Sequence, residues 1–255
     1  MRRLKRCDIM YGEFARVYDK LQDVDYGEFV SFYKKAFEKF GINPKLVLDL
    51  GCGTGNITVP MSESGYEMIG VDISSEMLDI ASNKARDKQL DILFLNQDMT
   101  EFELYGTVDA AVCALDGVNY LTEDGELIKL FELIQNYLNP NGIFIFDLNT
   151  EYKLKNIIGD NTFVYDEDDI YCVWDSEYDE DARICEFNLD FFIKQDSGLY
   201  KKGEEYQTER AYSEKEICET AEKAGLSVLG IFDGLRFSNA KKDSERITVV
   251  LRKNA

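Results

Sequence analysis

Residues 47–55 read Val47-Leu48-Asp49-Leu50-Gly51-Cys52-Gly53-Thr54-Gly55, the most informative segment of the sequence. A short apolar run is followed directly by glycines at alternate positions. Glycine allows the backbone to turn tightly and lets a ligand approach it to contact distance. Such a loop after a buried strand predicts a ligand-binding turn at the carboxyl edge of a sheet.

Short apolar runs alternate with helix-like stretches through most of the chain. The clearest helical stretches are Glu76–Ala85 and Glu126–Leu138. Strands that alternate with helices are typical of a parallel sheet with helices on both faces. We therefore predict an α/β fold with a doubly wound, Rossmann-like sheet of seven strands. The expected strands are Leu46–Leu50, Met68–Val71, Ile92–Leu95, Ala110–Leu115, Ile143–Leu148, Leu226–Phe232 and Ile247–Leu251.

Two segments fall outside this alternation. Before it, apolar spacing predicts an amphipathic helix over Asp25–Phe40 and a shorter one over residues 14–21, which form an N-terminal helical lid. After Asn149, residues 187–193 alternate with a two-residue period and Asp196-Ser197-Gly198 supplies a turn, so we expect an inserted antiparallel β cap. The predicted domains are residues 1–43 for the lid, 44–149 and 211–255 for the α/β core, and 150–210 for the cap.

The chain carries 49 acidic and 29 basic residues, a formal net charge of −20, and contains no histidine. Ser-His-Asp catalysis, Cys-His catalysis and histidine metal ligation are therefore excluded. The negative balance makes nucleic-acid binding an unfavoured function, because Lys and Arg supply much of that affinity. The six cysteines form no C-x-x-C pair, and no stretch approaches the roughly 18 apolar residues of a membrane helix. We expect a cytoplasmic protein with reduced thiols, no metal site and no membrane span.

The second predicted strand ends at Asp72, which lies 21 residues beyond Gly51. In that position its carboxylate can accept hydrogen bonds from two ribose hydroxyls, so the loop and Asp72 together predict a nucleoside-type cofactor. Dinucleotide sites instead use G-x-G-x-x-G/A, whose third small residue allows helix–strand packing beside a pyrophosphate. Asn56 occupies that position here, which argues against a nicotinamide oxidoreductase.

The stretch Asp49–Gly55 closely resembles the first motif of class I S-adenosylmethionine-dependent methyltransferases. The resemblance covers about residues 11–255 and implies that family's sheet, whose last strand is antiparallel. It also implies S-adenosyl-L-methionine as cofactor and S-adenosyl-L-homocysteine as product. Met77 stands where the family packs a side chain on adenine, although its helical apolar pattern equally fits the core. The resemblance implies a cofactor site of Asp49, Gly51, Cys52, Gly53, Gly55, Asp72, Ile73, Met77, Asp98, Met99, Leu115 and Tyr18.

The acceptor site is expected where the fourth strand ends. Candidates for a base are Asp116, Tyr120 and Glu205, although carboxylates near their reference pKa of about 4 are weak bases unless burial raises the pKa. Candidates for acceptor contacts are Asn119, Tyr120, Trp174 and Arg210. Asn119 and Tyr120 could instead cap a helix. Trp174 could pack inside the cap, and Arg210 could form a buried ion pair.

Within the family the chain is most similar to bacterial small-molecule methyltransferases, on the pattern Gln207, Arg210, Tyr212 and on Glu245-Arg246-Ile247. Relatives of that group include amino-sugar N-methyltransferases. We expect in-line transfer of a methyl group to an amine or hydroxyl of a small molecule, by a monomer or a homodimer. Positioning can supply most of the rate, because the sulfonium donor is already activated. The alternatives are a methyltransferase acting on RNA or protein and a non-catalytic S-adenosylmethionine-binding protein.

The acidic charge is concentrated in the predicted cap. Residues 151–212 hold 17 acidic and 7 basic side chains, half of the net charge of the whole chain. If these carboxylates face the acceptor site, an amine or cationic acceptor is favoured. If they face water, they only make the cap soluble, and charge runs are usually solvated.

Overall fold

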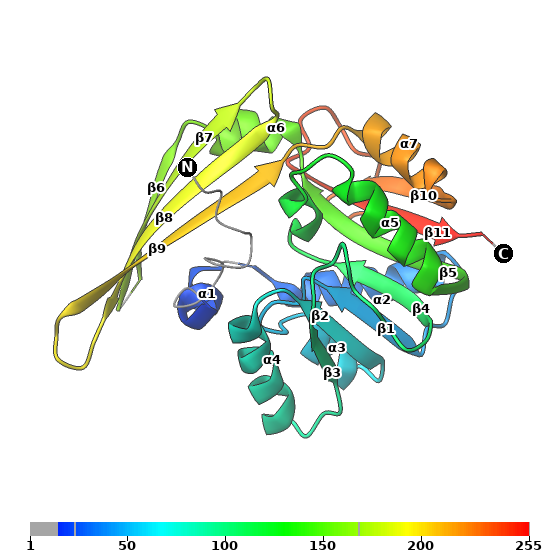
Figure 1. The fold of residues 1–255 in the computed structure, drawn as a ribbon, viewed down its shortest axis with the longest axis horizontal. Helices are drawn as coiled ribbons and strands as arrows, with labels where there is room; N and C mark the ends of the chain where they lie inside the picture. The colour runs from blue at the N-terminus through cyan, green and yellow to red at the C-terminus, as the bar shows by residue number, and fades with distance from the viewer. Residues whose placement is uncertain (1–14, 23, 168, 255) are drawn as a thin grey trace.

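The structure, a computed structural model, describes residues 15–22, 24–167 and 169–254. A seven-stranded sheet forms the core, and a four-stranded sheet projects from it (Figure 1). The large sheet has the strand order β10-β11-β5-β4-β1-β2-β3. Its strands are β1 (Leu46–Leu50), β2 (Glu67–Asp72), β3 (Leu93–Asn96), β4 (Val108–Cys113), β5 (Leu138–Asn149), β10 (Leu226–Asp233) and β11 (Arg246–Lys253).

The first five strands are parallel, and β11 runs antiparallel between β5 and β10. The predicted seven-stranded sheet with an antiparallel last strand is confirmed. Leu50 pairs with Val71, so β1 and β2 end side by side. This register brings the glycine loop after β1 next to Asp72 at the carboxyl edge, where ligands bind in such sheets.

Helices cover both faces of the large sheet. On one face α2 and α3 pack against it, with α4 beside α3, and on the other face α5 and α7 do so. These helices are α2 (Tyr26–Lys39), α3 (Thr58–Glu63), α4 (Ser75–Asp87), α5 (Glu126–Tyr137) and α7 (Glu214–Lys223). No helix within the described ranges is long and apolar enough to cross a membrane.

The lid is smaller than the sequence predicts. Helix α2 begins at its N-cap Asp25 and buries Phe29, Phe32, Tyr33 and Phe37 against the large sheet, because these residues share one helix face. It therefore belongs to the core. Only α1 (Ala15–Leu21) lies between the two sheets (Figure 1). Residues 1–14, including Phe14 of the expected first helix, lie outside the described residues.

The insertion begins with a short helical segment and continues as an antiparallel sheet of order β6-β7-β8-β9, which confirms the predicted β cap. On β8, Cys185, Phe187 and Phe191 are buried while Glu186 and Asn188 are exposed, so the two-residue period sets one inner face. The elements are α6 (Glu151–Lys153), the π-helical turn η2 (Leu154–Ile158), β6 (Thr162–Glu167), β7 (Ile170–Asp179), β8 (Ile184–Lys194) and β9 (Tyr200–Arg210).

Two strand ends differ from the prediction. Strand β4 ends at Cys113, because Leu115 and Asp116 adopt left-handed backbone angles, with φ of 55° and 56°. Strand β5 begins at Leu138, before the predicted start at Ile143, and its first residues are irregular, with a φ of 66° at Asn141. The first difference shapes the site described next.

Candidate active site

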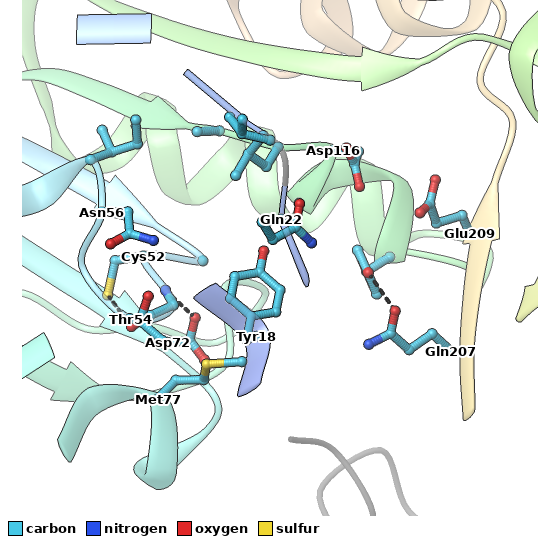
Figure 2. Close-up of a pocket in the computed structure, with 18 of the residues that line it drawn as sticks. Tyr18, Gln22, Cys52, Thr54, Asn56, Asp72, Met77, Asp116, Gln207 and Glu209 are labelled. Carbon is cyan, nitrogen blue, oxygen red and sulfur yellow. Dashed lines mark hydrogen bonds between the residues drawn. The ribbon is translucent and has the colours of Figure 1, made fainter. Parts of the chain in front are cut away.

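A cavity of about 450 Å³ is lined by residues from the carboxyl edge of the large sheet, from α1 and from the inserted sheet. Figure 2 shows that its side chains come from segments far apart in the sequence. We name its two parts after the ligands expected there. The cofactor end is lined by Asp49, Gly51, Cys52, Gly53, Thr54, Asn56, Asp72, Ile73, Met77, Gln97, Asp98 and Met99. The acceptor half is lined by Leu115, Asp116, Tyr120, Asn149, Lys153, Tyr165, Trp174, Phe187, Gln207, Glu209 and Arg246.

The glycine loop is held by Asp72. One carboxylate oxygen of Asp72 accepts a hydrogen bond from the Gly53 amide at 2.8 Å, and the other accepts one from the Ser74 amide at 2.8 Å. Burial raises the pKa of Asp72, while these backbone N–H groups act to lower it. Gly55 does not line the cavity. Its φ of 79° favours glycine, and a Cβ at this position would lie 3.0 Å from the Ala81 Cβ, so glycine lets the loop pack closely on α4.

Asp49 lies beneath the loop, at the cofactor end of the cavity. Its side chain is buried, and the Thr58 hydroxyl donates a hydrogen bond to its carboxylate at 2.6 Å. Burial raises the pKa of Asp49 to about 7, although the Thr58 hydrogen bond acts to lower it. The charge of Asp49 therefore changes near neutral pH, and a nearby cation favours its ionised form.

The remaining residues of the cofactor end follow β2 and β3. Ser74 caps α4 by accepting a hydrogen bond from the Met77 amide. The Met77 side chain is buried and also lines the cavity, so it serves the core and faces the ligand. Asp98 accepts hydrogen bonds from the amide and hydroxyl of Thr100 through one oxygen, at 2.7 and 2.8 Å. Its second oxygen has no hydrogen bond within the described residues, so it is available to a ligand.

Helix α1 is fastened over the cavity by Asp19. The Asp19 carboxylate accepts hydrogen bonds from the Thr54 hydroxyl at 2.6 Å, the Asn56 amide at 2.8 Å and the Lys84 ammonium at 2.6 Å. Burial raises the pKa of Asp19, but these three donors outweigh it and hold the pKa below its usual value. Tyr18, one residue earlier, lines the cavity between its cofactor end and its acceptor half (Figure 2).

A strained turn places Asp116 in the cavity. Leu115 and Asp116 are both left-handed, a conformation that costs non-glycine residues about 1 to 3 kcal/mol each. The buried carboxylate of Asp147 holds the turn, because it accepts hydrogen bonds from their amides at 2.9 and 3.1 Å. Arg246 bonds to Asp147 and, at 2.6 Å, to the Asp116 carboxylate. Asp116 is thus an ion-paired group on a braced loop.

The inner face of β9 supplies the wall of the acceptor half opposite Asp116. The Tyr120 hydroxyl donates a hydrogen bond to the side-chain oxygen of Gln207 at 3.0 Å. Glu209 is 4% exposed and accepts a hydrogen bond from the side-chain amide of Asn149 at 2.8 Å. Burial, and secondarily the charge of Asp116, raises the pKa of Glu209 well above its usual value. Among the described acidic residues of the insertion, Glu209 alone lines the cavity. The other described cap carboxylates lie away from it.

Three predicted acceptor residues lie outside the cavity. Glu205 is buried on the inner face of β9 but does not line the cavity, whereas Glu209, four residues later on the same face, does. Arg210 points to the other face, where it forms ion pairs with Asp124 at 3.0 Å and Glu216 at 2.8 Å. The structure thus places the Arg210 side chain in ion pairs and not in the lining of the cavity.

Asn119 is a structural link and not an acceptor contact. Its side chain is fully buried, and its amide donates to the backbone oxygens of Asn149 at 3.0 Å and Arg210 at 2.9 Å. Its side-chain oxygen accepts a hydrogen bond from the backbone N–H of Asn149 at 3.0 Å. All three hydrogen bonds join the loop after β4 to β5 and β9, so Asn119 fixes the insertion to the core.

Trp174 fulfils both roles that the sequence left open. Its ring packs on Phe163 and Phe187 inside the inserted sheet, with centroid separations of 5.2 and 5.4 Å, and it also lines the cavity. Sequence reasoning missed Asp19, Asp147, Lys153 and Glu209. Glu209 could have been found, because neighbouring residues of a strand point to opposite faces and Glu209 precedes Arg210. No local pattern marks Asp19, Asp147 or Lys153, since their partners lie far away in the chain.

The charges of the cavity fit a cationic cofactor. No lysine or arginine lines the cofactor end among the residues that the structure describes, whereas Asp49, Asp72 and Asp98 do. A pyrophosphate there would face carboxylates without a compensating cation. A sulfonium group carries the opposite charge and gains from the same surroundings. These residues therefore fit S-adenosylmethionine and disfavour a nicotinamide dinucleotide.

Comparisons with known proteins agree with this geometry. Residues 47–142 match the methyltransferase domain family. A relative from Geobacillus sp. (strain WCH70), named as a methyltransferase, is 32% identical over 245 residues, which are 95% of this chain and 99% of the relative. The crystal structure of an S-adenosylmethionine-dependent methyltransferase from Clostridium acetobutylicum ATCC 824 has a TM-score of 0.88 and 33% identity, over 95% of this chain and 98% of that one.

A more distant structure shares the whole fold. It is an S-adenosylmethionine-bound amino pentose methyltransferase from Micromonospora echinaspora, with a TM-score of 0.74 and 16% identity. The match covers 96% of this chain and 98% of that one, so the inserted sheet is part of the shared architecture.

Proposed function

Because this chain belongs to the class I S-adenosylmethionine-dependent methyltransferases, we propose that it methylates a nitrogen or an oxygen of a small molecule. The observation that carries the proposal is that the acceptor half is covered by other parts of the chain. The inserted sheet and α1 enclose that half, and the cavity of about 450 Å³ is of the size that small-molecule sites have. The amino pentose methyltransferase has a small-molecule acceptor and the same two-sheet fold.

The residues of the cofactor end hold and orient the donor. Bound S-adenosylmethionine supplies an electrophilic methyl group on a positively charged sulfur. Asp72 offers its remaining lone pairs to ribose hydroxyls, and the free oxygen of Asp98 can accept from the adenine amino group. Docking of α1 through Asp19 closes the cavity. These contacts fix the geometry of an in-line displacement, in which positioning supplies much of the rate.

The acceptor half supplies groups that can take a proton. A hydroxyl acceptor loses its proton as the methyl group joins it, and an ammonium acceptor must lose one proton before its nitrogen has a lone pair for the attack. Asp116, Tyr120 and Glu209 line this half, and the raised pKa of Glu209 makes it a stronger base than an ordinary carboxylate. Asp116 is less available, because its carboxylate is paired with Arg246 at 2.6 Å.

The test is incubation of the protein with isotope-labelled S-adenosylmethionine and an extract of small metabolites, followed by mass spectrometry. We expect label in a small molecule with the unaltered chain and none with Asp72→Ala, which lacks the ribose-binding carboxylate. Label found only in added RNA or protein would show that the acceptor class is wrong. Tight binding of S-adenosylhomocysteine without any labelled product would instead indicate a non-catalytic binding protein.

A further inference from the structure

Lys153 places an uncompensated cation in the acceptor half. It is the last residue of α6, at the start of the insertion, and it lines the cavity. Its ammonium donates one hydrogen bond, to the neutral side-chain oxygen of Asn149 at 2.9 Å. No carboxylate oxygen lies within ion-pair distance of this ammonium among the residues that the structure describes. Two of its three N–H donors are therefore unused.

Burial lowers the pKa of Lys153, and the neighbouring positive charge of Arg246 lowers it further. Three carboxylates act to raise the pKa of Lys153: Asp116 and Glu209 are bonded to other groups, and exposed Glu245 lies beyond ion-pair distance. Asp116 and Asp147 are both bonded to Arg246. Glu209 accepts from Asn149, and its raised pKa reduces its negative charge. The half-buried lysine thus has no ion-pair partner among the described residues.

A second unused donor lies in the same half. The indole Nε1 of Trp174 is buried and has no hydrogen-bond partner in the described part of the chain. Buried donors are nearly always paired, so each unpaired one needs an explanation. The Trp174 ring lines the cavity but its Nε1 is closed off from it, so Lys153 is the donor that a bound molecule can reach.

We propose that the methyl acceptor carries a carboxylate or phosphate group that binds Lys153 in the acceptor half, beside the ring of Trp174. This inference rests on the proposed small-molecule function. The net charge of −20 does not oppose it, because surface charges are screened over about 8 Å at physiological ionic strength and Glu209 is the lining acid from the described insertion. The local charges, and not the global one, then set the specificity.

The test uses acetate and inorganic phosphate as probes of the acceptor half. Trp174 is the only tryptophan of the chain, so its fluorescence reports on binding there. The complex with S-adenosylhomocysteine is titrated with each salt at constant ionic strength, balanced with chloride. We expect a saturating change with at least one probe. A response to acetate alone indicates a carboxylate, and a response to phosphate alone indicates a phosphate ester.

Variants at Lys153 decide the assignment. Lys153→Met should weaken the apparent affinity for the responding probe about tenfold or more, and Lys153→Arg should retain it within about threefold. Lys155→Met is the matched control, since Lys155 is exposed and pairs with Glu180. Retained affinity for S-adenosylhomocysteine shows that each variant is folded, and Lys153→Gln replaces any variant that fails this check.

The proposal is wrong if the unaltered complex responds to neither probe, or if Lys153→Met and Lys153→Gln bind them normally. It is also wrong if the labelling experiment returns an uncharged small molecule, a result that leaves the proposed function intact. Labelled RNA or protein, by contrast, would overturn the proposed function itself.

Discussion

The carboxylate of Asp72 accepts a hydrogen bond from the backbone amide of Gly53, 2.8 Å away, across the ends of two neighbouring strands. The residue expected to bind the ribose thus also braces the loop that surrounds it. A carboxylate has about four lone-pair sites, and the amides of Gly53 and Ser74 occupy two of them. Asp72 can therefore support the loop and bind two hydroxyls at the same time.

Replacement of this group should weaken cofactor binding strongly. Hydrogen bonds to charged groups are worth about 1.5 to 3 kcal/mol each, so the loss of two of them in Asp72→Ala should weaken S-adenosylhomocysteine binding by at least about 100-fold. Isothermal titration calorimetry measures this loss. Asp79→Ala, on the exposed side of α4, is the control and should bind normally. Normal affinity in Asp72→Ala would place the ribose elsewhere.

Asp116→Asn should reduce methyl transfer much less than Asp72→Ala. The asparagine keeps an oxygen for Arg246, and Asp147 still holds the turn through the amides of residues 115 and 116. If positioning supplies the rate, loss of the Asp116 charge matters less than loss of donor binding. Initial rates with the acceptor found by labelling give the ranking, and the opposite order would make Asp116 the base.

Asp19→Ala should open the lid. It removes three hydrogen bonds between α1 and the loop–α4 region, but Asp19 is about one-third exposed, so their combined contribution is about 1 to 2 kcal/mol. We expect S-adenosylhomocysteine to dissociate roughly tenfold faster, measured by stopped-flow fluorescence of Trp174. Asp87→Ala removes an exposed carboxylate from the same α4 and should leave the rate unchanged. Equal rates in both variants would mean that α1 does not limit release.

Asn119→Ala should destabilise the fold without changing the site. Three buried backbone groups, on Asn149 and Arg210, lose their partners, at a cost of about 3 kcal/mol in the free energy of unfolding. That corresponds to a decrease in Tm of roughly 6 to 12 °C for a chain of this size. Asn156→Ala, at an exposed position, should change Tm little. Affinity for S-adenosylhomocysteine below the melting range should be unchanged in both.

The sequence predicts the parts of the site that depend on neighbours in the chain. The glycine loop and Asp72 could be placed because strand–loop–helix order brings both to one edge. The bracing of Asp116 could not, because Asp147 and Arg246 come from β5 and β11 and meet only through the pairing of those strands. The sequence predicts Glu205 as a candidate base, whereas Glu209 lines the cavity. Both lie on the inner face of β9, and the local sequence does not show which part of that strand the cavity reaches.

The pKa of Asp49 predicts how the two forms of the cofactor respond to pH. With a pKa of about 7, Asp49 is largely protonated at pH 6 and largely ionised at pH 8. S-adenosylmethionine carries a sulfonium charge and S-adenosylhomocysteine does not, so only the former gains attraction as Asp49 ionises. We expect its affinity, relative to S-adenosylhomocysteine, to rise by about 1 kcal/mol, or roughly fivefold, from pH 6 to pH 8.

The ratio of the two dissociation constants still contains the titration of the ligands themselves, because the sulfonium charge lowers the pKa of the neighbouring amino group in S-adenosylmethionine only. The contribution of Asp49 is therefore the difference between the unaltered chain and a variant that cannot ionise at this position. Asp49→Asn keeps an oxygen for the Thr58 hydroxyl, 2.6 Å from the carboxylate in the structure, and cannot ionise. In Asp49→Asn the roughly fivefold change in the ratio of the two dissociation constants from pH 6 to pH 8 should therefore be lost. The same pH dependence in both chains would mean that Asp49 keeps one charge throughout, and a relative affinity for S-adenosylmethionine that rises more with pH in the variant would contradict the sign of the interaction.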